Sequence, residues 1–266
     1  MGQQVDLYNS AFNNPSEDVY REIRVETYGE DFGQTSWMTL DELDEIPVRL
    51  GLDPSSSVLE IGSGLGGCAV HLAMTVGCHV TGLDMNLGGV RNANELARAR
   101  GLESRARFRE CDASRGIPFD VNDFDAIYSN DALCHIPNRL ALLLDARRVM
   151  KPGGRLLYSD AVVITGEVSK EELATRSSIG HYAFSEAGEN ERVIAASGFK
   201  LLRVDDTTGN PAEIAKLWHD ARAKRKDALT SIEGEANFAG LQKFLLCTHT
   251  VAAERRLSRF LYLAQK

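Results

Sequence analysis

A glycine-rich turn in this chain is bordered by residues that could bind a charged, nucleotide-like ligand. The apolar segment 57–61 runs directly into glycines at positions 62, 64, 66 and 67. Residues without a Cβ atom let the backbone approach a ligand closely, and in a doubly wound sheet such a turn lies at the carboxyl end of the first strand. The spacing fits both Gly-x-Gly-x-x-Gly and Gly-x-Gly-x-Gly, two patterns that bind different cofactors. The turn therefore predicts a nucleotide-type cofactor without identifying it.

Acidic residues around the turn distinguish between the two patterns. Glu60 precedes the first glycine by two residues. Its carboxylate would lie near the pyrophosphate of a dinucleotide, whereas in an S-adenosylmethionine site it would lie beside the cationic methionine part. The sign of the charge favours S-adenosylmethionine. Asp84, 18 residues past Gly66, can accept both ribose hydroxyls of either cofactor, and Asp112 with Ala113 is expected near the adenine edge.

A second polar segment, residues 130–135, supplies candidates for chemistry on an acceptor. Asp131 and His135 are four residues apart. If the segment begins a helical turn, both side chains share one face and reach one bound amine. A histidine with an ordinary pKa of about 6.5 suits a general base, and Asp131 would attract an ammonium group by its charge. The competing interpretation is that His135 only orders the loop before Pro137.

Alternating apolar segments and helical patterns indicate the elements that position these residues. We predict strands at 57–61, 79–83, 106–110, 125–129, 155–159, 200–204 and 259–263, with helices between them, among them 168–179 and 186–197. Strands separated by helices imply right-handed crossovers. The expected fold is therefore α/β: a doubly wound, mostly parallel, seven-stranded Rossmann-like sheet.

Helical patterns outside the alternation suggest two additions to this sheet. Residues 1–52 are predicted to form a helical N-terminal cap or lid, and residues 53–266 the main domain. Apolar residues recur at helical spacing between about 207 and 257, which predicts a helical insertion before the last strand. Cap and insertion are expected to flank one edge of the sheet.

Composition excludes several classes of protein and partner. The net charge of −8 and the pI of about 5.3 disfavour a nucleic-acid substrate. The sequence has no apolar run of the roughly 20 residues that cross a bilayer and no secretory leader, so we expect no membrane partner. Five cysteines without a Cys-x-x-Cys pair fit a reducing cytoplasm better than a disulfide framework or a structural zinc site. We expect no metal in the catalytic site.

The sequence resembles the class I S-adenosylmethionine-dependent methyltransferases. Four segments in the appropriate order carry the resemblance, namely residues 58–67, 82–84, 124–135 and 151–156. Within the class, it is most similar to the phosphoethanolamine and the glycine/sarcosine/dimethylglycine N-methyltransferases, in which a segment matching Tyr28–Thr35 closes over the cofactor. The resemblance implies methyl transfer to a small-molecule acceptor and a monomer or homodimer. It also implies a set of cofactor-binding residues: Gln34, Glu60, Gly62, Ser63, Gly64, Asp84, Met85, Asp112, Ala113 and Asn130.

The chain departs from the phosphobase enzymes on the acceptor side. In those enzymes a lid tyrosine forms a dyad with the histidine that matches His135, but the matching position here is Arg24, so Tyr20 or Tyr28 would have to replace it. The arginine that grips the phosphate lies two residues before a tyrosine resembling Tyr182, and this chain has Gly180 there. A carboxylated amine or another small nucleophile is therefore as plausible as phosphoethanolamine. Further candidates for the acceptor site, besides Asp131 and His135, are Tyr28 as a catalytic residue and Tyr182 and Lys243 as binding residues.

Two other functions remain open from the sequence. A nicotinamide-dependent oxidoreductase can use the same sheet, although the single Tyr-x-x-x-Lys, Tyr262 with Lys266, falls on a predicted strand at the chain end. A protein that binds S-adenosylmethionine without catalysis would keep every cofactor motif.

Overall fold

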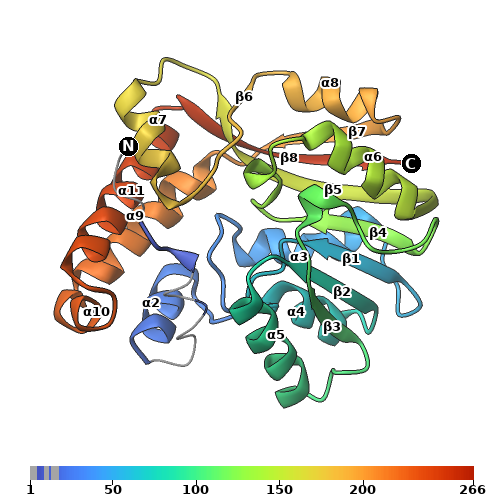
Figure 1. Ribbon diagram of the computed structural model, residues 1–266, viewed down its shortest axis with the longest axis horizontal. Helices are drawn as coiled ribbons and strands as arrows, with labels where there is room; N and C mark the ends of the chain where they lie inside the picture. The colour runs from blue at the N-terminus through green and yellow to red at the C-terminus, as the bar shows by residue number, and fades with distance from the viewer. Residues whose placement is uncertain (1–4, 9–11, 13–17) are drawn as a thin grey trace.

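A twisted sheet forms the centre of the protein, in a computed structural model that describes residues 5–8, 12 and 18–266 (Figure 1). The strand order is β3-β2-β1-β4-β5-β8-β7, with β6 paired to β5 beside this path. The strands are β1 (Ser57–Ile61), β2 (His79–Asp84), β3 (Ala106–Glu110), β4 (Phe124–Ser129), β5 (Met150–Ile164), β6 (Ser185–Glu186), β7 (Lys200–Asp206) and β8 (Leu257–Gln265).

The sheet is mostly parallel, as the alternation of strands and helices predicted. Among the strands of the described ranges, only β8 runs antiparallel, between β5 and β7. The predicted number of seven strands was one too low, because β6 adds a two-residue strand that pairs with the far end of β5. Strand β5 extends beyond the expected 155–159 at both ends. Met150 at its start pairs with Phe124 of β4, and its residues beyond Asp160 pair with β6 and with the start of β8.

Helices cover both faces of the sheet, which fits strands that are buried on two sides. One face carries α3 (Leu40–Leu50), α4 (Gly67–Thr75) and α5 (Leu87–Ala99), and the other carries α6 (Arg139–Val149) and α8 (Glu189–Ala196). Alternate residues of β1 serve the two cores: Val58 packs with the first group and Leu59 with the second. The period-2 geometry of a strand thus anchors β1 from both sides.

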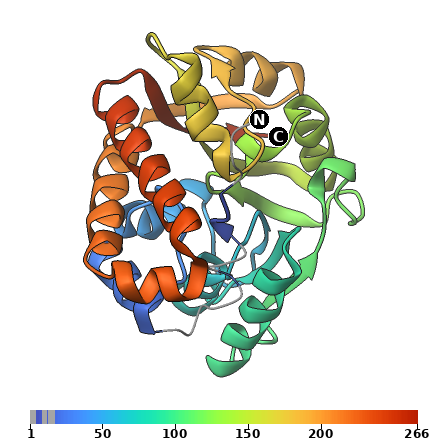
Figure 2. The same cartoon turned by 60° about the vertical axis from the view of Figure 1, so that its left-hand side comes forward.

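A wall of helices stands beside the carboxyl edge of the sheet. It consists of α2 (Asp18–Tyr28), α7 (Lys170–Arg176), α9 (Gly209–Ala223), α10 (Lys226–Glu233) and α11 (Glu235–Ala253). Figure 2 brings this wall forward, with α9 to α11 in orange and red and α2 in blue below them. Its apolar core joins Trp37, Trp218 and Phe244 to residues of β5. Helix α7 is shorter than the predicted 168–179, and a 3₁₀ turn follows it at Ser177–Ile179.

Helix α3 has a defined beginning and end that its sequence explains. The Thr39 side chain caps its first turn by accepting a hydrogen bond from the Glu42 amide, and Gly51 ends it in the left-handed conformation that favours glycine. These caps fix the register of α3, so that Glu42 faces inward and is buried. Among the described residues, no helix has the length and apolar character needed to cross a membrane.

Candidate active site

The glycine turn lies at the carboxyl end of β1, where neighbouring elements leave no room for side chains. A Cβ on Gly62 would lie 2.2 Å from the Ala132 side chain, and one on Gly67 would lie 1.6 Å from the Phe32 carbonyl oxygen. Gly62 also has a positive φ of 80°. The glycines therefore let the loop after β4 and the residue 32 backbone approach the turn.

Three neighbouring strands bring the predicted cofactor residues to one edge. Asp84, at the end of β2, accepts hydrogen bonds of 2.8 Å from the amides of Gly64 and Asn86. The next residue, Met85, has 73% of its surface exposed, so an apolar side chain stands in solvent beside this carboxylate. Asp112 follows β3 and accepts a hydrogen bond from Ser114, in a short 3₁₀ turn that begins at Ala113.

Glu60 is a buried carboxyl group with unused hydrogen-bonding capacity. Its side chain is 2% exposed, and its Oε2 atom has no hydrogen-bond partner among the described residues. Within the described part of the chain, the buried Ser63 hydroxyl also has no hydrogen-bond partner. Burial raises the pKa of Glu60 to about 8 against the lowering effect of the Tyr128 hydroxyl, and the charge of Asp84 adds to the rise. A buried acid with an unused oxygen beside a glycine cradle fits the positively charged part of S-adenosylmethionine.

Residues 29–39, here called the lid loop, cover the turn. Arg24 of α2 holds Asp31 in the loop with a 2.6 Å ion pair. The Gln34 side chain ties the loop to itself, because it accepts from the Phe32 amide and donates to the Glu30 carbonyl. Phe12 packs against Gly64 from the N-terminal side. Gln34 thus shapes the cover over the predicted cofactor site through its own loop.

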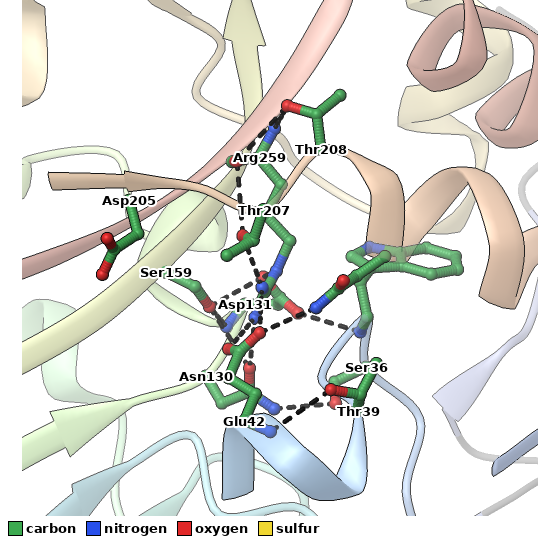
Figure 3. A network of polar contacts seen from close by, with 12 residues as sticks. Ser36, Thr39, Glu42, Asn130, Asp131, Ser159, Asp205, Thr207, Thr208 and Arg259 are labelled. Atoms are coloured by element: carbon green, nitrogen blue, oxygen red, sulfur yellow. Dashed lines mark hydrogen bonds and ion pairs between the residues drawn. The ribbon is translucent and has the colours of Figure 1, made fainter. Parts of the chain in front are cut away.

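Asp131 lies at the centre of a buried polar network (Figure 3). One carboxylate oxygen accepts from Arg259 Nε at 2.9 Å and from the Ser159 hydroxyl at 2.8 Å, and the other accepts from the Trp37 amide at 2.9 Å. Arg259 is fully buried and also pairs with Glu42, with both nitrogen–oxygen distances at 2.7 Å.

This network corrects the expected placement of Asp131. The residue has a positive φ of 52° and precedes the 3₁₀ turn Leu133–His135, so Asp131 and His135 do not share a helical face. Its carboxylate is committed to Arg259 and to the lid loop rather than presented to an amine. Asn130 belongs to the same network, because its amide donates to the Ser36 hydroxyl and its Oδ1 accepts from Arg259.

His135 is oriented by hydrogen bonds on both ring nitrogens. Nδ1 lies 2.8 Å from the His181 carbonyl oxygen, and Nε2 lies 3.1 Å from the Tyr8 hydroxyl. Because a carbonyl only accepts, Nδ1 carries the ring proton and Nε2 accepts from Tyr8. Burial lowers the pKa of His135, which keeps the imidazole neutral. The ring of Tyr182 packs against it with 4.4 Å between centroids.

The tyrosine whose hydroxyl reaches His135 is Tyr8, which the sequence interpretation missed. The two expected candidates are engaged elsewhere: Tyr28 donates to the Ser36 carbonyl at 2.8 Å and Tyr20 donates to Glu233. Tyr8 lies in no motif and is far from His135 in the sequence, so no spacing signal could have found it.

Of the two remaining acceptor candidates, the structure places one near His135 and the other away from it. Tyr182 belongs to the cluster around His135, whereas Lys243 is exposed on α11 and is not brought into it. Arg176, which the sequence interpretation also missed, is buried beside Tyr182, with 5.1 Å between its Cζ atom and the ring centroid. The described part of the chain contains no group of three or more His, Cys, Asp or Glu residues placed to hold a metal ion.

Comparison with known proteins identifies the core of the chain. Residues 59–158 match the family described as "Methyltransferase domain". A glycine/sarcosine/dimethylglycine N-methyltransferase of Actinopolyspora halophila is 32% identical over 125 residues, which cover 47% of this chain and 22% of that protein. A sterol 24-C-methyltransferase of Gibberella zeae is 38% identical over 106 residues, which cover 40% of this chain and 28% of that protein. The chain therefore spans less than a third of the length of these curated relatives.

The fold comparison agrees with the sequence comparison. Phosphoethanolamine N-methyltransferase 2 of Haemonchus contortus, solved with phosphomonomethylethanolamine and S-adenosylhomocysteine, superposes with a TM-score of 0.80 at 22% identity, covering 97% of this chain and 60% of that one. The resemblance drawn from the four motifs is thus confirmed: residues 59–158 match a methyltransferase domain, the chain is similar to N-methyltransferases, and its fold is that of the superposed methyltransferase.

Proposed function

We propose that this protein transfers a methyl group from S-adenosylmethionine to the nitrogen of a small-molecule acceptor, with His135 as the base. The observation that carries the proposal is the hydrogen bond between Tyr8 and a neutral His135 whose other nitrogen is fixed by the His181 carbonyl. Such an arrangement supplies a proton acceptor of defined orientation.

Glu60, Asp84 and the glycine turn are the residues that would hold the cofactor. S-adenosylmethionine supplies an electrophilic methyl group when bound. The buried Glu60 carboxyl would face its positive charge, Asp84 its ribose hydroxyls and the exposed Met85 its adenine ring. These assignments rest on charge, on burial and on position at the carboxyl ends of β1 and β2.

The protein's remaining task is to free the acceptor's lone pair. An ammonium group beside Tyr8 can pass a proton to the Tyr8 oxygen while Tyr8 passes its own proton to His135 Nε2. The nitrogen is then neutral and nucleophilic, and His135 carries the positive charge. Tyr8 ends this relay as a neutral hydroxyl, and His135 returns to its starting state when its extra proton leaves to solvent. Burial of the group favours loss of the charge from His135 afterwards.

A second candidate is methyl transfer to carbon, which the name of the Gibberella zeae relative suggests. Carbon methylation does not need an ammonium group to lose a proton before attack, so the Tyr8–His135 pair favours nitrogen. Hydride transfer with a nicotinamide cofactor is less well supported, because residues 59–158 match a methyltransferase domain.

The net charge of −8 supports a small-molecule acceptor over a nucleic acid. The five free cysteines favour a reducing compartment such as the cytoplasm.

Incubation with methyl-labelled S-adenosylmethionine and a panel of amines, amino acids, phenols and sterols tests the proposal. We expect label to enter amines or amino acids, and much less label with His135→Ala. Labelled sterol as the sole product would support the carbon-acceptor candidate instead. Binding of S-adenosylmethionine without transfer to any acceptor would favour a non-catalytic role.

A further inference from the structure

Arg176 is a buried guanidinium group with half of its hydrogen-bonding edge unused. The residue ends α7 and has 1% of its surface exposed. Its Nη1 donates to the Thr248 hydroxyl at 2.7 Å, whereas Nε and Nη2 are buried and have no hydrogen-bond partner among the described residues. No carboxylate in the described part of the chain forms an ion pair with Arg176, unlike the other buried arginines Arg24, Arg139, Arg222 and Arg259.

Aromatic rings surround this charge. The Arg176 Cζ atom lies 4.7 Å from the ring centroid of Phe244, 5.1 Å from that of Tyr182 and 5.8 Å from that of Trp37. Cation–π attraction to these rings offsets only part of the free-energy penalty of burying the guanidinium charge. The folded protein therefore holds a positive charge that an incoming anion would stabilise.

The unused donors have a geometry that selects the anion. Nε–H and Nη2–H lie on the same side of the planar guanidinium and point in parallel, which matches the two oxygens of a carboxylate. Thr248 occupies the other side, and its own hydroxyl donates to the Phe244 carbonyl, so the guanidinium is held in place. The free edge is thus preorganised for a two-point contact.

The position of Arg176 connects this edge to the base. Tyr182 contacts both groups, since its ring centroid lies 4.4 Å from that of His135 and 5.1 Å from the Arg176 Cζ atom. The cover over the cluster is the N-terminal segment, in which the Val5 amide bonds the Ser178 carbonyl at 2.7 Å and Tyr8 reaches His135. A ligand that bridges the two sites would therefore lie under Val5 and Tyr8.

We propose that the free edge of Arg176 binds a carboxylate of the acceptor, so that the substrate is a carboxylated amine whose nitrogen faces Tyr8 and His135. This inference rests on the proposed function for the identity of the acceptor, but the anion site itself can be tested without any methyl transfer. Arg176 would thus be the anion-binding residue of the cluster. Gly180 carries no charge, and Lys243 is exposed on α11 outside the cluster.

The protein contains its own reporter for this site. Its two tryptophans are Trp37 and Trp218, whose rings lie 6.1 Å apart, and Trp37 also contacts Arg176. Intrinsic fluorescence therefore reports from the cluster. We would titrate the full chain with acetate, and separately with inorganic phosphate, each replacing chloride at constant ionic strength.

We expect acetate to change the tryptophan fluorescence saturably and to bind more tightly than phosphate. Arg176→Lys keeps the charge but loses the paired donors, and it should weaken acetate binding at least tenfold. Arg176→Met should abolish the response, and Lys170→Met, which removes an exposed charge from the same helix, should leave it unchanged. Arg176→Lys keeps the test valid if the methionine variant does not fold.

Three results would overturn the inference: no response of the wild type to acetate, equal acetate affinity in Arg176→Lys and the wild type, or tighter binding of phosphate than of acetate. The outcome is independent of the proposed function. If acetate binding depends on Arg176 but the protein methylates no acceptor, the proposed function is wrong and the carboxylate site stands. If the protein transfers methyl groups but does not bind acetate through Arg176, the inferred carboxylate site is wrong and the proposed function stands.

Discussion

Arg259 of the last strand holds Asp131 of the loop after β4 through a 2.9 Å contact between Nε and Oδ1, and both side chains are buried. The pair joins segments 128 residues apart in the chain. Through the Trp37 amide on Asp131 and Glu42 on Arg259, it also fixes the lid loop and α3.

Asp131→Asn tests whether this carboxylate is part of the structure or part of the acceptor site. The substitution leaves Arg259 with one charged partner fewer, so we expect destabilisation of about 3 kcal/mol, measured by urea unfolding. Turnover should fall with the population of the ordered lid loop, with KM little changed. A raised KM for the acceptor at wild-type stability would instead mean that Asp131 binds the substrate.

His135→Ala should lower turnover by about 10²-fold or more while S-adenosylmethionine affinity stays within about threefold, because His135 lies in the acceptor cluster. Tyr8→Phe is the matched variant: it keeps the ring and loses the hydroxyl, so it should reduce turnover by about tenfold or more. Steady-state kinetics and calorimetry provide the two readouts. Near-normal turnover in His135→Ala would show that the residue only supports the loop.

The pH dependence of the rate should reflect the lowered pKa of His135. A base is active when it is unprotonated, so the rate falls as pH drops through the pKa. Because burial lowers that pKa, the acid limb of kcat should lie below the ordinary value of about 6.5. We expect this limb to disappear in His135→Ala. An acid limb that persists unchanged in the variant would assign the titration to another group.

Glu60 should couple cofactor binding to proton release. With its pKa raised to about 8, Glu60 is protonated at neutral pH in the free protein, whereas a bound cation favours the carboxylate. Affinity for S-adenosylmethionine should therefore rise by up to about tenfold per pH unit toward pH 8 and level off above it. Calorimetry in buffers of different ionisation enthalpy measures the released proton.

Glu60→Gln is the control for this linkage, and it should bind more weakly with no pH dependence in this range. The same raised pKa means that Glu60 contributes stability to the free protein at low pH and loses this contribution as pH rises through about 8. Equal wild-type affinity at pH 6 and pH 8 would contradict the assignment.

Cofactor binding should order the lid loop. Residues 32 and 33 pack on the glycine turn, and the Trp37 amide is bonded to Asp131. Hydrogen exchange over residues 28–38 should therefore slow when S-adenosylmethionine or S-adenosylhomocysteine binds. Exchange on the exposed start of α7 serves as the internal reference. Unchanged exchange at residues 28–38 would remove the lid from the proposed mechanism.

The sequence by itself determined the sheet and the edge at which the predicted cofactor residues lie. Glycines at fixed spacing after a buried strand, with Glu60 before them and Asp84 at the end of the next strand, form a local signal, because parallel strands bring their carboxyl ends to one edge whatever the loops do. Strand β6 was not predicted, because a strand of two residues is too short to show a periodic pattern in the sequence.

Only the tertiary structure decided the acceptor side. Tyr8 meets His135 across 127 positions and Arg259 meets Asp131 across 128, and nothing local in the sequence encodes such contacts. Asp131 illustrates the limit: its position after β4 suggested a free carboxylate, but Arg259 from the last strand neutralises it. A residue's type and place in the chain indicate what it can do, whereas the partners that commit it come from segments that only folding brings together.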